Sequence, residues 1–128
     1  MEDRYLFRAK RIDNGEWAVG QYVNTCYSGN DKETRHFIVV YPNGYHEIYT
    51  STICQCTGLK DKNGKLIWEN DIVKINNSKV NTVITFRDFE IICTIPNEKY
   101  YKHRLEYDTE YEVIGNKFDN PELLKSEE

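Results

Sequence analysis

The stretch that decides the fold is Gln55-Cys56-Thr57-Gly58-Leu59-Lys60-Asp61-Lys62-Asn63-Gly64-Lys65-Leu66-Ile67-Trp68-Glu69-Asn70-Asp71-Ile72-Val73. At its centre, Asn63-Gly64 separates two apolar stretches, and both residue types tolerate the positive φ that a tight hairpin turn requires. A turn with solvated flanks accounts for most of the polar residues here, namely Asp61, Lys62, Asn63, Lys65, Glu69 and Asp71. The stretch therefore predicts a turn that fixes the register of two strands.

Two further Asn-Gly pairs predict hairpins upstream of this stretch. Asn14-Gly15 would join strands at 5–12 and 16–23, and Asn43-Gly44 would join strands at 36–41 and 45–50. Pro42 belongs to the second turn, because it presets a turn dihedral and cannot donate to a strand ladder.

Downstream, the apolar pattern predicts strands at 71–75, 80–86, 89–95 and 111–114, the last ending at Gly115. In the strand at 89–95, a two-residue period predicts one inward face, formed by Phe89, Ile91, Cys93 and Ile95. Residues 97–108 fit neither period, so they are expected to form a loop or one helical stretch. Asn120-Pro121 predicts a short terminal helix with Asn120 as its cap.

Composition favours sheet over helix. The chain of 128 residues has ten Tyr, five Phe and two Trp, whereas only Ala9 and Ala18 represent the best helix former. This length fits one domain with one core. The sequence thus predicts a single α+β domain, predominantly antiparallel β, over residues 1–128.

Charge and cysteine content narrow the function classes. The net charge of −4 argues against a protein that coats nucleic-acid phosphates non-specifically, because that mode needs a surplus of Lys and Arg. No apolar run reaches the length of a signal peptide or the roughly 20 residues that span a bilayer, so we expect a cytoplasmic protein without a membrane partner. The four cysteines are then expected to be reduced thiols.

The residues that could carry chemistry have simpler explanations. Cys54 and Cys56 lie on the same side of a predicted strand, and a pairing strand could bring His46 near them, which would suit a metal. A role as small apolar fillers in a half-buried strand explains the two cysteines better. Closely spaced acids on a strand usually form its solvated face. The acids with this spacing here are Glu69, Asp71, Asp108, Glu110 and Glu112. No nucleophile motif or phosphate-binding glycine loop is found, so we expect a protein that is not an enzyme and holds no cofactor or metal.

Two clusters of basic and aromatic residues are candidate partner-binding surfaces. The first is formed by Arg4, Arg8 and Lys10, with Arg11 beside them, and the second by Tyr100, Tyr101 and Arg104, with Tyr107 nearby. Such clusters can bind a protein or a nucleic acid. The simpler interpretation of the first cluster is the outer face of an edge strand, where cations discourage stray pairing.

The central stretch resembles the signature of the YopX family of phage and prophage proteins. The opening Phe7-Arg8-Ala9-Lys10 and the closing segment from Glu112 to Leu124 also resemble the family's ends, in the same order. The motif residues that we expect to be structural are Gly58, Asn63, Gly64, Asn70, Asp71, Gly115 and Pro121. The family usually has Gly where this chain has Asn70, which supports a positive φ there, and an aromatic residue is commoner at Cys56.

The resemblance implies a phage or prophage product acting inside a bacterial cell, with a β-rich α+β fold. Its turns are also laid out like those of small SH3-like barrels, which implies a barrel-like C-terminal sheet region followed by a short helix. The family offers no catalytic residue to carry over. We therefore expect a small non-catalytic module that binds a host or phage protein, with self-association as one form. The alternative is a nucleic-acid-binding accessory protein in phage replication or regulation.

Overall fold

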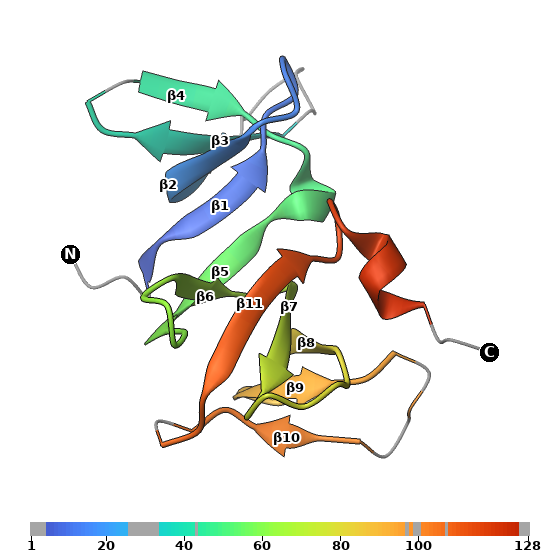
Figure 1. The fold of residues 1–128 in the computed structure, drawn as a ribbon. Coiled ribbons are helices and arrows are strands. Elements are labelled where there is room, and N and C mark those ends of the chain that lie inside the picture. The colour runs from blue at the N-terminus through green and yellow to red at the C-terminus, as the bar shows by residue number, and fades with distance from the viewer. Residues whose placement is uncertain are drawn as a thin grey trace. The chain divides into compact units, whose positions relative to one another are not determined.

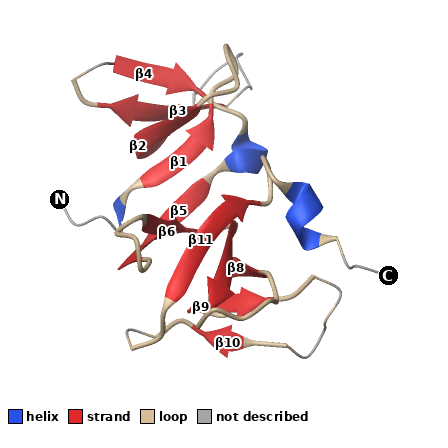
Figure 2. Ribbon diagram, viewed as in Figure 1, coloured by secondary structure: helices blue, strands red, loops and turns tan. Residues whose placement is uncertain are grey.

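Short antiparallel strands form most of the regular structure (Figure 2). The computed structural model describes residues 5–25, 34–42, 44–96, 98, 101–106 and 108–125. Contacts within the chain divide it into two compact units, Met1–Cys56 (unit 1) and Thr57–Glu128 (unit 2). The single domain over residues 1–128 stays a prediction.

Unit 1 contains the two hairpins that the first Asn-Gly pairs predict (Figure 1). The first is formed by β1 (Phe7–Lys10) and β2 (Trp17–Thr25), and the second by β3 (Arg35–Val40) and β4 (Gly44–Glu47). A short 3-10 helix, η2 (Thr50–Thr52), then leads to β5 (Cys54–Lys60). The strand order in unit 1 is β4-β3-β2-β1-β5, so β1 has a neighbour on both sides. The expectation of an edge strand at Arg8 and Lys10 was wrong, because β5 pairs with the side of β1 that would have been free.

One face of the unit 1 sheet is a small core. Ala9, Ala18, Ile38 and Ile48 are buried there, and Phe7 packs against them. Small residues on β1 and β2 leave room for larger side chains from β3, which is how two alanines come to lie in a core of β-branched and aromatic residues.

β5 passes from unit 1 into unit 2, where β6 (Leu66–Trp68) is its neighbour. The other strands of unit 2 form an open antiparallel sheet in the order β10-β9-β8-β7-β11. Their bounds are β7 Asp71–Ile75, β8 Thr82–Arg87, β9 Glu90–Thr94, β10 His103–Arg104 and β11 Tyr111–Asn116. Two predicted strands are therefore shorter than expected at their N-termini, and the last one runs on through Gly115 to Asn116.

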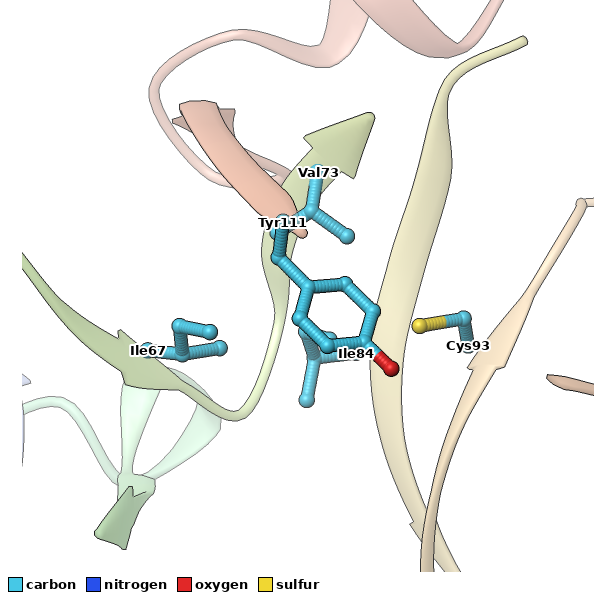
Figure 3. Packing of buried hydrophobic residues seen from close by; sticks show 5 residues of the cluster. All are labelled: Ile67, Val73, Ile84, Cys93 and Tyr111. Atoms are coloured by element: carbon cyan, nitrogen blue, oxygen red, sulfur yellow. The ribbon is translucent and has the colours of Figure 1, made fainter. Parts of the chain in front are cut away.

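The core of unit 2 is built around Tyr111 (Figure 3). Its ring lies among Ile67, Val73, Ile84 and Cys93, all of which are fully buried. Strands from distant parts of the chain supply these side chains, so the core forms only when β6, β7, β8, β9 and β11 are in register.

Two of the predicted elements differ in the structure. Residues 103–104 form the edge strand β10, which pairs with β9 through His103 with Cys93 and Arg104 with Ile92, so the expectation of a loop or helix there was wrong. The pairing partners are ten and twelve residues away in sequence, which a local period does not reveal. The predicted terminal helix is a four-residue 3-10 helix, η3 (Pro121–Leu124), and Asn120 makes no side-chain cap. Asn97, the first residue of the stretch expected to be a loop or helix, lies outside the described residues.

Candidate functional site

The hairpin of β8 and β9 ends in a two-residue turn at Asp88-Phe89. Both residues have positive φ, 52° and 65°, and Arg87 pairs with Glu90 to close the turn. Positive φ at both turn residues is the combination that the right-handed twist of a hairpin favours. The usual sequence of such a turn is Asn-Gly, however, and not Asp-Phe. A bulky residue in the left-handed region costs roughly 1–2 kcal/mol. Phe89 is also wholly exposed. The expectation that Phe89 faces inward from a strand was wrong, because the strand begins only at Glu90.

Phe89 lies at the rim of a shallow groove of about 480 Å³ in unit 2. The groove takes apolar lining from Leu59, Ile91 and Leu105, and Thr57 adds a side chain whose hydroxyl donates to the carbonyl of Ile67 at 2.7 Å. Leu105 is held against β9 by a backbone hydrogen bond from its N–H to the carbonyl of Ile91, at 3.2 Å. The groove therefore has an apolar lining from β5, β9 and the residue after β10, and an exposed aromatic ring at its edge.

Charged residues form another part of this rim. Glu90 pairs with Lys102 Nζ at 2.8 Å and accepts a hydrogen bond from Arg104 Nη2 at 2.6 Å. Lys102, and after it Arg104, hold the pKa of Glu90 below its ordinary range, so Glu90 is ionised at neutral pH. Two cations face one carboxylate, which leaves this trio with a charge of +1. The side chains of Lys102 and Arg104 are still more than half exposed.

The structure separates the predicted partner-binding residues by unit. Arg104 lines the groove in unit 2, and Tyr101 lies three residues before it, partly buried, with its pKa raised first by burial and then by Cys93. Arg8 and Lys10 are on β1 in unit 1, over the ring of Trp17. Arg4, Tyr100 and Tyr107 lie outside the described residues.

The motif residues of the central stretch hold turns and strands. Gly58 has φ +81° within β5, Asn63 and Gly64 form the turn between β5 and β6, and Asn70 has the positive φ that its sequence position predicts, 71°. Gly115 lies in β11, where a Cβ atom would stand 2.5 Å from Asn120 Oδ1. The remaining two are Asp71, the first residue of β7, and Pro121, the first of η3.

Two carboxylates of this stretch are buried, which corrects the expectation of solvated flanks. Asp61 is 6% exposed and accepts backbone hydrogen bonds from Asn63, Lys65 and Val113, each at 2.9 Å. Asp71 is 2% exposed and accepts the N–H of Trp68 at 2.8 Å. The burial of Asp61 raises its pKa, but the three backbone donors together outweigh burial, so its pKa is lower than usual. The task of these two acids is therefore to organise the backbone around the turns.

The described cysteines are buried, and Glu112 is paired with a cation. Cys54, Cys56 and Cys93 are buried thiols outside any disulfide, as the sequence predicts, and Cys26 lies outside the described residues. Burial raises the pKa of Cys93 to about 11, which keeps it a thiol at neutral pH. Glu112 pairs with Lys62 at 3.9 Å on the surface. In the part of the chain that the structure describes, no three His, Cys, Asp or Glu side chains are placed to hold a metal ion.

Sequence reasoning found Arg104 but missed the groove itself. The apolar lining comes from β5, β9 and the segment after β10, which lie far apart in the sequence. One local signal does exist, because Asp88 is a turn residue in the middle of an apolar run and tolerates the left-handed region. It points to a turn there but not to an exposed aromatic ring.

Comparison with known proteins identifies a family. The model of the family described as YopX protein matches residues 6–125, a range that includes nearly all described residues of both units. No curated protein matches the chain. None of the helices in the described parts of the chain has the length and apolar character needed to cross a membrane.

Proposed function

The chain belongs to the YopX protein family, and from that premise we propose that it is a small, non-catalytic interaction module that binds a partner protein through the groove of unit 2. The observation that carries this proposal is Phe89, a fully exposed aromatic ring on a residue with φ 65°. A fold gains nothing from an exposed ring in a strained backbone, so the ring is better explained by a contact with another molecule.

The groove suits an extended protein segment with mixed chemistry. Leu59, Ile91 and Leu105 offer an apolar floor for one anchoring side chain, and aromatic residues such as Phe89 are enriched where interfaces gain most of their affinity. The +1 charge of Lys102, Arg104 and Glu90 favours a carboxylate beside that anchor. The partner would therefore present an apolar residue flanked by Asp or Glu.

The biological setting is part of the same proposal. Proteins of this kind would act in the cytoplasm of a bacterial host, as products of a phage or prophage, with a host or phage protein as partner. Self-association is one form of this function, in which a second copy of the chain supplies the segment that binds in the groove. The turns at Asn63-Gly64 and at 69–71, together with the short strands of unit 2, also support a small SH3-like barrel there.

The test is affinity capture from lysogenic or infected cells with the parent chain and two groove variants, Phe89→Ser and Arg104→Glu. Both side chains are exposed, so neither change should disturb the core. The matched control is Tyr41→Ser, which removes an aromatic ring that is 93% exposed in unit 1. We expect one protein to be enriched by the parent and by the control and lost from both groove variants.

Two outcomes would contradict the proposal. Repeated captures that enrich no protein above background would remove the interaction function. A protein captured equally well by the parent and the Phe89→Ser and Arg104→Glu variants would remove the groove as its site. Sedimentation of the parent distinguishes self-association, because a monomer at working concentration excludes that form.

A second candidate function, nucleic-acid binding, rests on a different surface. The cations Arg8 and Lys10 lie over Trp17 on unit 1, at 4.6 Å and 5.4 Å from its ring centroid. This pairing of charge with an aromatic ring favours nucleic-acid binding as the second candidate.

A further inference from the structure

The tip of the β8–β9 hairpin and the groove of unit 2 are neighbours on one surface. Phe89 stands at the rim of the groove, yet its ring is wholly exposed and so does not fill the groove. The apolar lining is formed by Leu59, Ile91 and Leu105, which also pack against the core of unit 2. This surface therefore carries an aromatic projection and, beside it, an apolar hollow backed by the core.

The hairpin tip also carries a carboxylate that is available for a contact. Asp88 precedes Phe89 in the turn and is exposed. No cation in the described parts of the chain forms an ion pair with it. Beside the groove, Lys102 and Arg104 are more than half exposed and share the one carboxylate of Glu90. The tip thus offers a negative charge and the rim an excess positive one, so the two are complementary.

Asp88-Phe89 has the chemistry of the segment that the groove is proposed to bind. That segment presents an apolar residue flanked by Asp or Glu, and the chain itself presents one at this exposed turn. Ile12 beside Asp13 has the same pattern and is 44% exposed, but Arg11 already pairs with Asp13 at 2.6 Å. Asp88-Phe89 is therefore the better match within the chain.

We propose that the partner of the groove is a second copy of the chain, with the Phe89 ring of each copy inserted into the groove of the other. This inference rests on the proposed function and names its partner. Asp88 of one copy then lies beside Lys102 and Arg104 of the other copy. Because projection and hollow are neighbours on one surface, a two-fold axis between them fills both grooves at once. The assembly closes as a dimer and leaves no groove for a third copy.

The charges at this contact let two copies approach, and its size sets the strength of the dimer. The formal charges of the turn and of residues 102–106 balance, since three are cations and three are carboxylates: Arg87, Lys102 and Arg104 with Asp88, Glu90 and Glu106. Each aromatic ring buries roughly 150–250 Å², so the contact stays below the roughly 1,200 Å² of a stable interface. The dimer is therefore weak, with an expected dissociation constant between ~1 μM and ~1 mM.

The test is sedimentation of the full chain from ~5 μM to ~500 μM, with circular dichroism to check that each variant is folded. The variants are Phe89→Ser, Asp88→Lys and Arg104→Glu, and Tyr41→Ser is the matched control in unit 1. We expect the parent and the control to pass from monomer to dimer without larger species, and the three variants to dimerise roughly tenfold more weakly. Asp88→Asn keeps a residue that tolerates positive φ, so it decides the role of this carboxylate if Asp88→Lys does not fold; we expect a smaller loss in the same direction.

A mixture of the Asp88→Lys and Arg104→Glu chains tests the reciprocal contact. Each variant alone places like charges against each other. In a mixed dimer, the lysine introduced at position 88 faces the glutamate introduced at position 104, and the second contact keeps Asp88 beside Arg104. We therefore expect the mixture to dimerise more strongly than either variant alone. A dimer formed through another surface would show no such rescue.

Three results would overturn the inference. They are a parent that stays monomeric up to ~500 μM, Phe89→Ser and Arg104→Glu chains that dimerise like the parent, and folded charge variants whose mixture shows no rescue. The proposed function fails separately, when affinity capture enriches no protein or is indifferent to the same groove variants. A monomeric parent that captures a different protein through the groove would remove the dimer and leave the proposed function standing.

Discussion

The carboxylate of Asp61 accepts the backbone N–H of Val113 at 2.9 Å, across 52 residues of sequence. Its other oxygen accepts the N–H groups of Asn63 and Lys65 within the turn between β5 and β6. One side chain therefore ties this turn to β11. The backbone agrees with this arrangement, because the N–H of Lys62 donates to the carbonyl of Tyr111 at 2.9 Å.

Replacing Asp61 by Ala should lower the free energy of unfolding by about 3 kcal/mol, because three backbone donors lose a charged acceptor. Asp61→Asn should cost less, since an amide oxygen can still accept from Asn63 and Lys65 while its NH₂ group faces the Val113 N–H. Urea unfolding measures both changes. A loss below about 0.5 kcal/mol for Asp61→Ala would show that water replaces the carboxylate at no cost.

Asp61 should also make the protein sensitive to acid. Its pKa in the folded chain lies below its ordinary value of 3.8, so the unfolded chain binds the proton more readily. The stabilisation by the Asp61 carboxylate is therefore complete above the pKa that Asp61 has in the unfolded chain. It is lost as the pH falls through the pKa of Asp61 in the folded chain. We expect the stability difference between parent and Asp61→Asn to shrink between ~pH 5 and ~pH 2. A difference that stays constant over this range would contradict the assignment.

Gly64 should be replaceable only by residues that accept its backbone conformation. Its φ is +83° and no atom lies within 4 Å of the position that a Cβ atom would take, so the cost of a side chain there is conformational rather than steric. Gly64→Val should lower the free energy of unfolding by roughly 1–2 kcal/mol and therefore melt at a clearly lower temperature. Gly64→Asn should lose much less stability. If Gly64→Val melts like the parent, the turn does not need a positive φ in solution.

What the sequence predicts well is local. Asn63-Gly64 and Asn14-Gly15 mark turns because the required φ belongs to the residues themselves, and the strand at 71–75 follows from its own apolar pattern. The resemblance to the YopX family, carried by the same central stretch, is confirmed by the family match.

What the sequence does not reveal depends on pairing across the chain. The local sequence predicts that Arg8 and Lys10 lie on an edge strand, but β5, more than forty residues later, pairs with β1. The local sequence predicts that Asp61 is a solvated residue beside a turn, but in the structure its carboxylate accepts the N–H of Val113 on β11. Phe89 fits a strand period because the turn ends one residue later than the pattern suggests. For Arg8, Lys10 and Asp61 the deciding partner is absent from the local sequence, whereas the turn at Phe89 is itself local.

Phe89→Gly should stabilise the protein while weakening its partner contact. Glycine adopts φ 65° without the penalty that a bulky side chain meets, and an exposed ring contributes nothing to the core. We expect a gain of about 1 kcal/mol in the free energy of unfolding, read from urea or thermal melts. A loss of stability would mean that the ring makes intramolecular contacts, and its exposure would then say nothing about a partner.

The two tryptophans report on the two units separately. Trp17 lies on β2 in unit 1 and Trp68 lies in β6 in unit 2. Because β5 contributes to both units, we expect them to unfold together as one domain. In the variants Trp17→Phe and Trp68→Phe, the fluorescence midpoint in urea should then coincide with the midpoint from circular dichroism. Separate transitions within one variant would show two independent domains.

The most direct test of the proposed interaction function is photo-crosslinking from position 89 in living host cells. A photoreactive phenylalanine analogue at position 89 keeps an aromatic ring at the rim of the groove, and the same analogue at position 41 is the matched control on unit 1. We expect one discrete crosslinked species from position 89 that is absent from position 41 and is lost when Arg104→Glu is added. No species from position 89 above the control would contradict it.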